Sequence, residues 1–404
     1  MVNNDNLNHI KSLDGLRGIA ALMVVFFHSP IPLFQFEFGW IGVNLFFILS
    51  GFLITSILLE IKQQPFNIYI KNFYSRRALR IFPLYFMYLI LVFLVLLLLN
   101  KGYPVQDENT KQGFLDFKNN YPYLLTFTYN LGSVVNFLVG KDYHNSVFTG
   151  HLWTLSVEVQ FYIIFALIVY FLRIKILKIL CVAFIFIVPL LRLSMVLYFE
   201  GNHFPPFWIG SVLYNFTLFQ LDSLAMGSCL ALFNFSRIIK NSTFYLSLLI
   251  ILIIIVGTVH LIYLRNDQVE NSSLGYDLPV YHIAKKPSLY PILNNRYFYT
   301  IPIINLTFGL LMLLMIKNRI HDGFFANKFL TTTGRISYSI YIYHLALSYF
   351  FILLVKTIFS KEPGQFDWPY QIGFMVIYLA ILFLIAGLSY RHLEKWFLRP
   401  RKSN

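Results

Sequence analysis

Charged residues are scarce in this sequence. Asp, Glu, Lys and Arg make up 12% of the 404 residues, whereas they make up about 25% of a soluble globular domain. Hydrophobic residues account for 57% of the chain and aromatic residues for 19%. Because too few polar side chains are present to cover a water-exposed surface, the composition excludes a soluble fold and indicates an integral membrane protein.

Cysteine is nearly absent as well. The two cysteines, Cys181 and Cys229, both fall within long apolar runs, so a disulfide framework and a CxxC metal site are excluded. The sequence also lacks GxGxxG, GxxxxGKS/T, HExxH and GxSxG motifs in the contexts that give them meaning. Nucleotide-binding loops, zinc peptidases and serine hydrolases therefore lack support, and we expect no metal ion.

Long apolar runs recur along the whole chain, for example LYFMYLILVFLVLLLL at 84–99. A helix that crosses a lipid bilayer needs about 20 such residues. We therefore expect an all-α, polytopic membrane protein, with a single bundle of about ten transmembrane helices. The stretch 121–139 is interrupted by Gly and polar residues, which favours an interfacial or re-entrant segment. The predicted spans are about 15–34, 39–59, 80–99, 152–172, 176–199, 214–235, 243–264, 298–316, 336–358 and 369–389.

The formal net charge of +14 would suggest nucleic acid as the partner of a soluble protein, but in a membrane protein the placement of Lys and Arg matters more. With the N-terminus in the cytoplasm, the cytoplasmic segments hold most of these residues. We predict cytoplasmic N- and C-termini and no nucleic-acid partner. The last predicted span ends near residue 389, so we expect one transmembrane domain over 1–404 with no appended soluble domain.

Arg17 and His28 lie in the first predicted span, within LDGLRGIAALMVVFFH. Eleven residues of α-helix give a net angular offset of about 20° and an axial separation of roughly 16 Å, so the two side chains share a face at different depths. Ionisable groups inside a span are costly and point to function, and histidine is suited to general-base chemistry. The alternatives are a structural histidine and an arginine that anchors the helix at the inner leaflet.

Three arginines, Arg76, Arg77 and Arg80, occur at the start of the third predicted span. Their i, i+3 and i, i+4 spacings place them together on one helix end. Because guanidinium groups bind phosphate oxygens in a bidentate manner, the cluster predicts a site for a polyphosphate ligand. The alternative is that these arginines only follow the positive-inside rule, by which Lys and Arg concentrate on the cytoplasmic side of a membrane protein.

Two further segments carry polar groups at predicted helix ends. HLWTLSVEVQFY contributes Trp153, Ser156 and Glu158, and GRISYSIYIYHLAL contributes Tyr338, Tyr341 and His344. Interfacial anchoring is the alternative reading for the tyrosines. Glu158 and Asp222 are acids within spans and need partners. Arg192 is a possible counter-charge to either of them.

Seven segments, in chain order, are typical of one family: LDGLRGIAALMVVFFH, GWIGVNLFFILSGFLIT, RRALRIFPLY, HLWTLSVEVQFY, LDSLAMG, GRISYSIYIYHLAL and SYRHLEKWFLR. With them, residues 13–399 resemble acyltransferase family 3, the membrane O-acyltransferases that modify bacterial surface sugars. The resemblance implies a ten-helix core in the bacterial cytoplasmic (inner) membrane. It also implies transfer of an acyl group, usually acetyl, from cytoplasmic acyl-CoA to a hydroxyl of a carbohydrate or glycolipid outside.

The family's motifs fall on individual residues of this sequence. Its arginine-x10-histidine motif matches Arg17 and His28, and the resemblance implies that His28 is the essential catalytic group. Its arginine-x2-arginine motif matches Arg77 and Arg80, which the resemblance links to acyl-CoA, and its motif glutamate matches Glu158. The sequence departs from the family at Asn44 and Gln220, where aspartate and arginine are frequent.

These residues combine into a mechanistic hypothesis. The CoA phosphates would bind at the arginine cluster, with help from Arg17, and the thioester would reach His28. His28 would act either as a general base or as an acyl carrier, and Glu158 would orient His28 or the acceptor. We expect the acceptor to contact five residues: Trp153, Ser156, Tyr338, Tyr341 and His344.

A transporter is the competing class of function. A proton-coupled carrier or flippase of a sugar or glycolipid would use His28, Glu158 and Asp222 as a relay and would consume no acyl-CoA. The acceptor is open among lipopolysaccharide, other polysaccharides, peptidoglycan, glycolipids and small molecules, and so is the length of the acyl chain.

Overall fold

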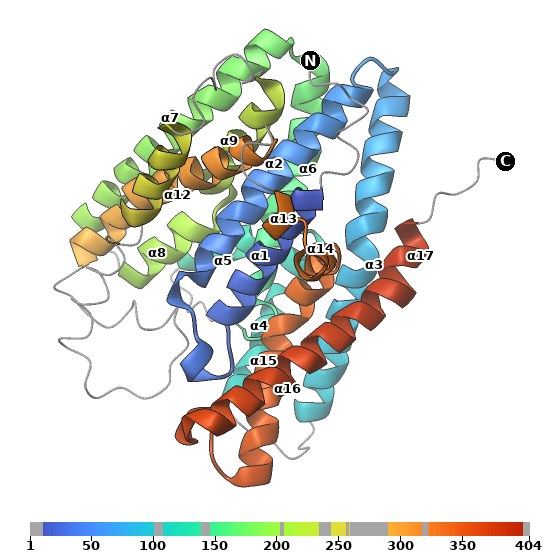
Figure 1. The fold of residues 1–404 in the computed structure, drawn as a ribbon, viewed down its shortest axis with the longest axis vertical. Coiled ribbons are helices and arrows are strands. Elements are labelled where there is room, and N and C mark those ends of the chain that lie inside the picture. The colour runs from blue at the N-terminus through green and yellow to red at the C-terminus, as the bar shows by residue number, and fades with distance from the viewer. Residues whose placement is uncertain are drawn as a thin grey trace. The chain divides into compact units, whose positions relative to one another are not determined.

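The computed structural model describes residues 11–100, 108–138, 146–202, 206–233, 244–255, 258, 290–316 and 322–398, and these residues form helices and connecting turns without a β-strand (Figure 1). Six helical segments are long and apolar enough to cross a membrane: Phe38–Ile61, Phe66–Leu99, Gly150–Phe171, Ile174–Phe199, Ser337–Phe359 and Trp368–Leu398. Shorter apolar helices cover Thr217–Leu232, Phe244–Ile255 and Thr300–Ile316. The prediction of an all-α, polytopic membrane protein is confirmed.

Each of the ten predicted spans coincides with a helix in the part of the chain that the structure describes. The helices, in the order of the predicted spans, are α1 (Lys11–Phe27), α2 (Ile41–Ile61), α3 (Phe66–Asn100), α6 (Trp153–Phe171), α7 (Ile174–Gly201), α9 (Leu221–Leu232), the helix Phe244–Ile255, α12 (Tyr290–Ile316), α15 (Ser337–Phe359) and α16 (Trp368–Ser389).

Several boundaries differ from the prediction. α9 begins at Leu221 rather than near residue 214, and α12 begins at Tyr290 rather than near residue 298. α1 ends at Phe27 rather than near residue 34, because Pro30 and Pro32 follow and proline cannot continue a helical hydrogen-bond ladder. Short 3-10 turns, η2 (Pro32–Phe34) and η3 (Glu37–Trp40), then lead into α2. α3 begins at Phe66, well before the apolar run, so the arginine cluster lies inside this helix rather than at its first residues.

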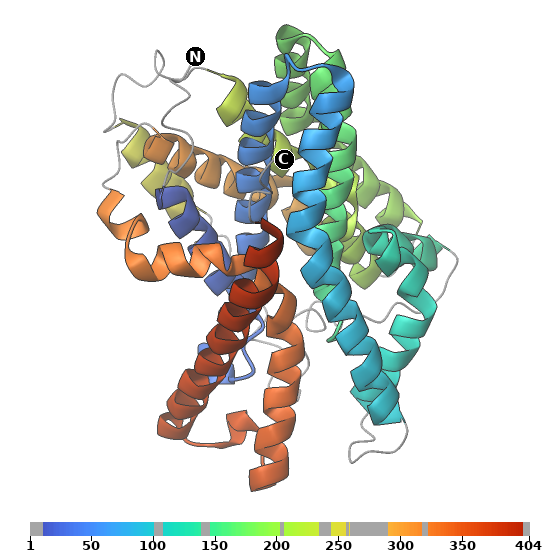
Figure 2. The ribbon, with the colours of Figure 1, turned by 90° about the vertical axis from the view of Figure 1, so that its right-hand side faces the viewer.

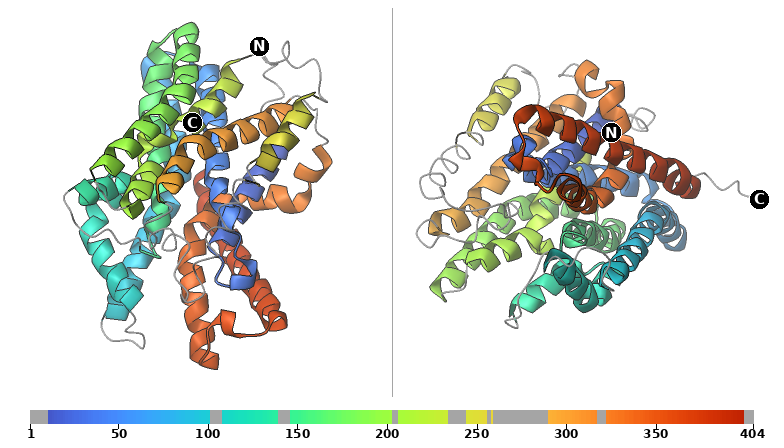
Figure 3. Two further views of the ribbon diagram at one scale, coloured as in Figure 1. Left: turned by 90° about the vertical axis from the view of Figure 1, so that its left-hand side faces the viewer. Right: turned by 90° about the horizontal axis from the view of Figure 1, so that it is seen from below.

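The interrupted stretch 121–139 forms the end of α4 (Glu108–Leu125) and all of α5 (Tyr129–Leu138). The break lies at Phe127, whose φ of 54° is in the left-handed region, a conformation that ends a right-handed helix. Neither helix is among those long and apolar enough to span. α4 packs against α3 and α5 against α4 (Figure 3).

The chain divides into two compact units. The first unit comprises Met1–Leu16, Val43–Glu60 and Leu167–Asn327, and the second comprises Arg17–Gly42, Ile61–Ala166 and Lys328–Asn404.

In the first unit, α2 and α9 cross at very short range. A Cβ atom on Gly51 of α2 would lie 2.0 Å from the carbonyl oxygen of Leu224, so only glycine fits at this crossing. One turn further along α2, the Thr55 hydroxyl donates to Ser228 Oγ over 2.9 Å. This crossing fixes the position of the polar groups that α2 and α9 bring into the unit.

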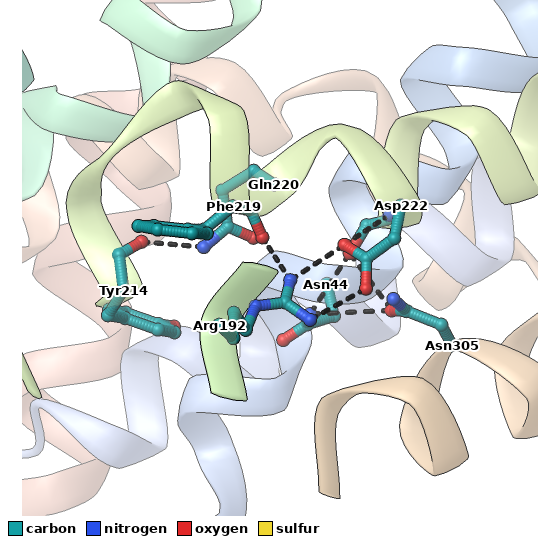
Figure 4. A network of polar contacts seen from close by, with 8 residues as sticks. Asn44, Arg192, Tyr214, Phe219, Gln220, Asp222 and Asn305 are labelled. Atoms are coloured by element: carbon teal, nitrogen blue, oxygen red, sulfur yellow. Dashed lines mark hydrogen bonds and ion pairs between the residues drawn. The ribbon is translucent and has the colours of Figure 1, made fainter. Parts of the chain in front are cut away.

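Those polar groups form a buried network in the first unit (Figure 4). Arg192 of α7 forms a bidentate ion pair with Asp222 of α9, through Nη1 to Oδ2 at 2.8 Å and Nη2 to Oδ1 at 2.7 Å. Beside the pair, Asn44 Nδ2 lies 3.2 Å from Ser223 Oγ and 3.4 Å from Asn305 Oδ1. The counter-charge of Arg192 is therefore Asp222 rather than Glu158.

The second unit contains α3, α6, α15 and α16 together with the end of α1 and the helix α14 (Lys328–Arg335). α15 and α16 lie side by side as a hairpin (Figure 2). A π-helical turn, η8 (Tyr390–Glu394), and the short helix α17 (Lys395–Leu398) follow α16 and pack against α3. This unit holds every residue that the sequence predicts for the catalytic, donor and acceptor sites.

Candidate active site

Two histidines from distant parts of the chain meet in the second unit. His28 lies immediately after the end of α1, and His344 lies in the second turn of α15. His28 Nδ1 and His344 Nε2 are 3.2 Å apart, and the ring centroids are 5.0 Å apart. The Ser348 hydroxyl donates to the carbonyl oxygen of His28 over 3.0 Å and so fixes the backbone beside the ring.

The hydrogen-bond partners determine which nitrogen carries the proton in each neutral ring. His344 Nδ1 lies 2.7 Å from the carbonyl oxygen of Tyr341. Because a carbonyl only accepts, His344 carries its proton on Nδ1 and its Nε2 is an acceptor. His28 Nδ1 faces that acceptor and the carbonyl oxygen of Val24, which is 3.1 Å away.

His28 must therefore donate from Nδ1, and the lone pair of its ring lies on Nε2. Among the described residues, His28 Nε2 has no hydrogen-bond partner. His344 is fully buried, whereas His28 is half-buried. Of the two rings, His28 thus has a basic nitrogen without a hydrogen-bond partner among the described residues.

A third histidine, His151, joins the pair, and the sequence analysis did not assign it to the site. Its ring is T-shaped against His344 with centroids 5.2 Å apart, and its Nε2 donates to the carbonyl oxygen of Ile342 over 3.0 Å. Its Nδ1 is buried and has no hydrogen-bond partner in the described part of the chain. Its place two residues before Trp153, in the motif that carries Glu158, was the signal available in the sequence.

The tyrosines of α15 that are predicted to contact the acceptor substrate form hydrogen bonds within the protein. The Tyr341 hydroxyl donates to the carbonyl oxygen of His151 over 2.8 Å and lies 2.6 Å from the Thr154 hydroxyl. The Tyr338 hydroxyl donates to the carbonyl oxygen of Ile81 over 2.8 Å. Tyr341 therefore ties α15 to the start of α6, and Tyr338 ties it to α3.

Trp153 and Ser156, at the start of α6, are both buried. The Ser156 hydroxyl donates to the carbonyl oxygen of Leu152 over 3.4 Å. Arg17 lies in α1, eleven residues before His28, and is half-buried.

Glu158 lies on the arginine side of the second unit. Its Oε1 accepts a short hydrogen bond from the Tyr162 hydroxyl. The Arg77 guanidinium lies 5.9 Å from the centre of the Tyr162 ring and 6.0 Å from that of Phe73. The hydrogen bonds of His28 do not include Glu158.

Of the three arginines, Arg76 is exposed, while Arg77 and Arg80 are half-buried. Arg77 Nε is buried and has no hydrogen-bond partner among the described residues. A second acid, Glu394 of η8, is 5% exposed, accepts a short hydrogen bond from the Ser339 hydroxyl and interacts electrostatically with Arg80. Arg77 and Arg80 therefore each lie near a carboxylate, Glu158 and Glu394 respectively.

No group of three or more His, Cys, Asp or Glu residues that could hold a metal ion occurs in the described ranges. The site in the second unit thus consists of a histidine pair with one free basic nitrogen and of an arginine cluster flanked by two acids. Such groups can move a proton and bind phosphates.

Comparison with known proteins places this architecture in a family. The chain is 27% identical over 400 residues to "Putative O-acetyltransferase SACOL0978" of Staphylococcus aureus strain COL, covering 97% of this chain and 58% of that protein. It is 25% identical over 392 residues to the O-acetyltransferase OatA of Staphylococcus aureus strain NCTC 8325, covering 96% of this chain and 57% of that protein.

The chain thus spans little more than half the length of these relatives, and no solved structure matches it. A family model described as "Acyltransferase domain" matches residues 10–390, which is nearly the whole chain. On this match, the chain belongs to the acyltransferase 3 family.

Proposed function

We propose that this protein is a membrane O-acetyltransferase that moves an acetyl group from cytoplasmic acetyl-CoA to a hydroxyl of a carbohydrate or glycolipid on the far side of the membrane. Family membership and the names of its relatives support this class of reaction. The observation that carries the proposal is the hydrogen-bonded pair of His28 and His344, which leaves His28 Nε2 as an unpartnered base.

In the proposed reaction, His28 Nε2 removes the proton of the acceptor hydroxyl as its oxygen attacks the thioester carbonyl. The new C–O ester bond forms, the C–S bond to CoA breaks, and the thiolate takes the proton back from Nε2. General-base catalysis of this kind typically contributes about 10²- to 10⁴-fold in rate. The rival route transfers the acetyl group to Nε2 first and then to the hydroxyl.

The donor binds through the arginine cluster of α3. CoA carries several phosphates, and arginine binds phosphate through paired, charge-assisted hydrogen bonds. Arg77 retains a buried Nε donor without a partner. Arg80, the exposed Arg76 and Arg17 of α1 complete the proposed donor site, and Glu158 and Glu394 hold the guanidinium groups in place.

The acceptor binds around His28. The polar side-chain groups of Tyr338, Tyr341 and His344 bond within the protein, so their contribution is to shape the site. Trp153 and Ser156 line the start of α6 beside His151. The buried His151 Nδ1, which has no hydrogen-bond partner among the described residues, is a further hydrogen-bond acceptor beside the proposed site.

Both termini are cytoplasmic in this proposal, and residues 1–404 act as one transmembrane domain in the bacterial inner membrane. The acceptor is a polysaccharide such as lipopolysaccharide, or another envelope glycan.

The test uses purified protein in lipid nanodiscs with radiolabelled acetyl-CoA and a membrane glycan extract. Label transferred to glycan is expected with the wild-type protein and not with His28→Ala, while His392→Ala, which changes an exposed histidine of the same unit, keeps activity. Full activity of folded His28→Ala would refute His28 as the base. Glycan movement across liposomes without acetyl-CoA consumption would instead establish the transporter.

A further inference from the structure

We propose that His344 is a positioning residue that accepts the Nδ1 proton of His28 during the reaction, so that the two histidines work as one proton-transfer unit. The proposal rests on the proposed acetyl transfer and adds a second residue to it. It starts from the 3.2 Å contact between His28 Nδ1 and His344 Nε2 and from the direction of that hydrogen bond.

The need for a partner follows from the surroundings. When His28 Nε2 takes the proton of the acceptor hydroxyl, the ring becomes an imidazolium, and a cation within a membrane-spanning bundle needs a hydrogen-bond acceptor at each of its N–H groups. In a Ser-His-Asp triad, a carboxylate stabilises that imidazolium through its Nδ1–H. Here the two acceptors facing His28 Nδ1 are the carbonyl oxygen of Val24 and the imine nitrogen of His344.

Of these two acceptors, only the histidine can bind a proton. As Nε2 of His28 gains a proton, the Nδ1 proton shifts to His344 Nε2, and His28 becomes a neutral ring protonated on Nε2. His344 then carries the charge, with its Nδ1–H still bonded to the Tyr341 carbonyl oxygen. When the CoA thiolate takes the Nε2 proton, the Nδ1 proton returns to His28, so no proton is gained or lost.

The same transfer serves the acyl-histidine route. Attack of His28 Nε2 on the thioester carbonyl forms a C–N bond, breaks the C–S bond and releases the CoA thiolate, and loss of the Nδ1 proton to His344 turns the N-acyl imidazolium into a neutral acyl-imidazole. When the acceptor hydroxyl then attacks the acyl group, the C–N bond breaks, the hydroxyl proton passes to the thiolate, and His344 returns its proton to His28 Nδ1. The proposal therefore does not depend on which of the two routes the enzyme follows.

The groups around His344 leave it free for this role. The titratable side chains that face it are His28, His151, Tyr341 and Tyr378. The Tyr378 hydroxyl donates to the backbone carbonyl oxygen of His344 over 3.1 Å, and Ser348 Oγ lies 2.8 Å from the same oxygen, so neither hydroxyl bonds to the His344 ring. No carboxylate or cation is among these described contacts, so no stronger proton acceptor competes with the imidazole.

The decisive variant is His344→Gln. The glutamine oxygen can accept the hydrogen bond from His28 Nδ1–H and so preserve its orientation, but it cannot take the proton. We expect kcat to fall about 100-fold or more, within the range of general-base effects, while KM for acetyl-CoA stays at the wild-type value. His392→Gln, at an exposed histidine of the same unit, is the matched control and should retain full kcat.

A second measurement needs no variant. The kcat of the wild-type protein, measured in mixtures of H₂O and D₂O, should depend on the deuterium fraction along a curve, because two protons move together. Wild-type kcat in folded His344→Gln would overturn the role of His344 on either route, and a straight line would overturn it for the general-base route, in which both protons move in one step. Failure of the proposed function is distinct, since the wild-type protein would then transfer no acetyl group at all.

Discussion

Arg192 and Asp222 form a bidentate ion pair in which the side chains are 0% and 2% exposed. Removing one partner of a buried pair leaves an uncompensated charge, which typically costs about 3–5 kcal/mol. Asp222→Asn should therefore lower the thermal stability of the protein in detergent strongly. The double variant Arg192→Met with Asp222→Leu should recover most of that loss, because neither charge remains. Equal destabilisation by the single and the double variant would contradict this account.

The arginine cluster gives a prediction about the donor. Arg77→Ala combined with Arg80→Ala should raise KM for acetyl-CoA, since each charge-assisted hydrogen bond to phosphate is worth about 1.5–3 kcal/mol. The expected increase is about tenfold for each arginine. Lys71→Ala, at an exposed position of the same helix, is the control for a general loss of positive charge. An unchanged KM in the double variant would mean that the arginines only set the orientation of the helix in the membrane.

Hydrophobic patterning is sufficient to predict the helices of this protein. Apolar runs such as 84–99 are long enough to predict a membrane span directly, and each predicted span overlaps a helix within the described residues. The helix ends were less predictable. The early end of α1 at Phe27 depends on two prolines, whereas the early start of α3 at Phe66 includes polar residues that hydropathy alone assigns to a loop.

The sequence allowed candidate site residues to be named, but it did not allow their contacts to be predicted. Spacing within one helix placed Arg17 with His28 and Arg77 with Arg80, because helical periodicity fixes such relationships. The contact of His28 with His344 joins residues 316 positions apart, and no local pattern encodes it. The pairing of Arg192 with Asp222 was left open for the same reason, and the approach of His151 to His344 was not predicted.

Two hypotheses about the role of Glu158 predict different kinetic effects of its substitution. As a residue beside Tyr162 and Arg77, it should affect donor binding, whereas a residue that orients His28 should affect the chemical step. We expect Glu158→Gln to raise KM for acetyl-CoA and to leave kcat near the wild-type value. Steady-state kinetics at saturating acceptor measure both constants. A large fall in kcat at unchanged KM would return Glu158 to the role of orienting His28.

Asp116 of α4 lies outside the membrane-spanning segments and predicts a pH dependence of stability. Its carboxylate is 5% exposed and accepts hydrogen bonds from Thr149 at 2.9 Å, Tyr129 at 3.2 Å and Asn120 at 2.8 Å. Burial raises the pKa of Asp116 from 3.8 to about 6, although these hydrogen bonds oppose the shift. A raised pKa in the folded state means that the protonated form is favoured there.

The unfolding free energy of the α4–α5 hairpin should therefore be highest at low pH and should fall as the pH rises through 6. Between pH 5 and pH 7 the expected loss is about 1 kcal/mol. Hydrogen–deuterium exchange over 108–138, corrected for the intrinsic pH dependence of exchange, measures it. Asp116→Asn keeps the shape of the side chain but cannot ionise, so its hairpin should lose this dependence, and an identical pH profile in the variant would show that another group is responsible. Thr149, which donates to Asp116, directly precedes the turn that carries His151, so the hydrogen bonds of the hairpin extend to the segment that holds this histidine.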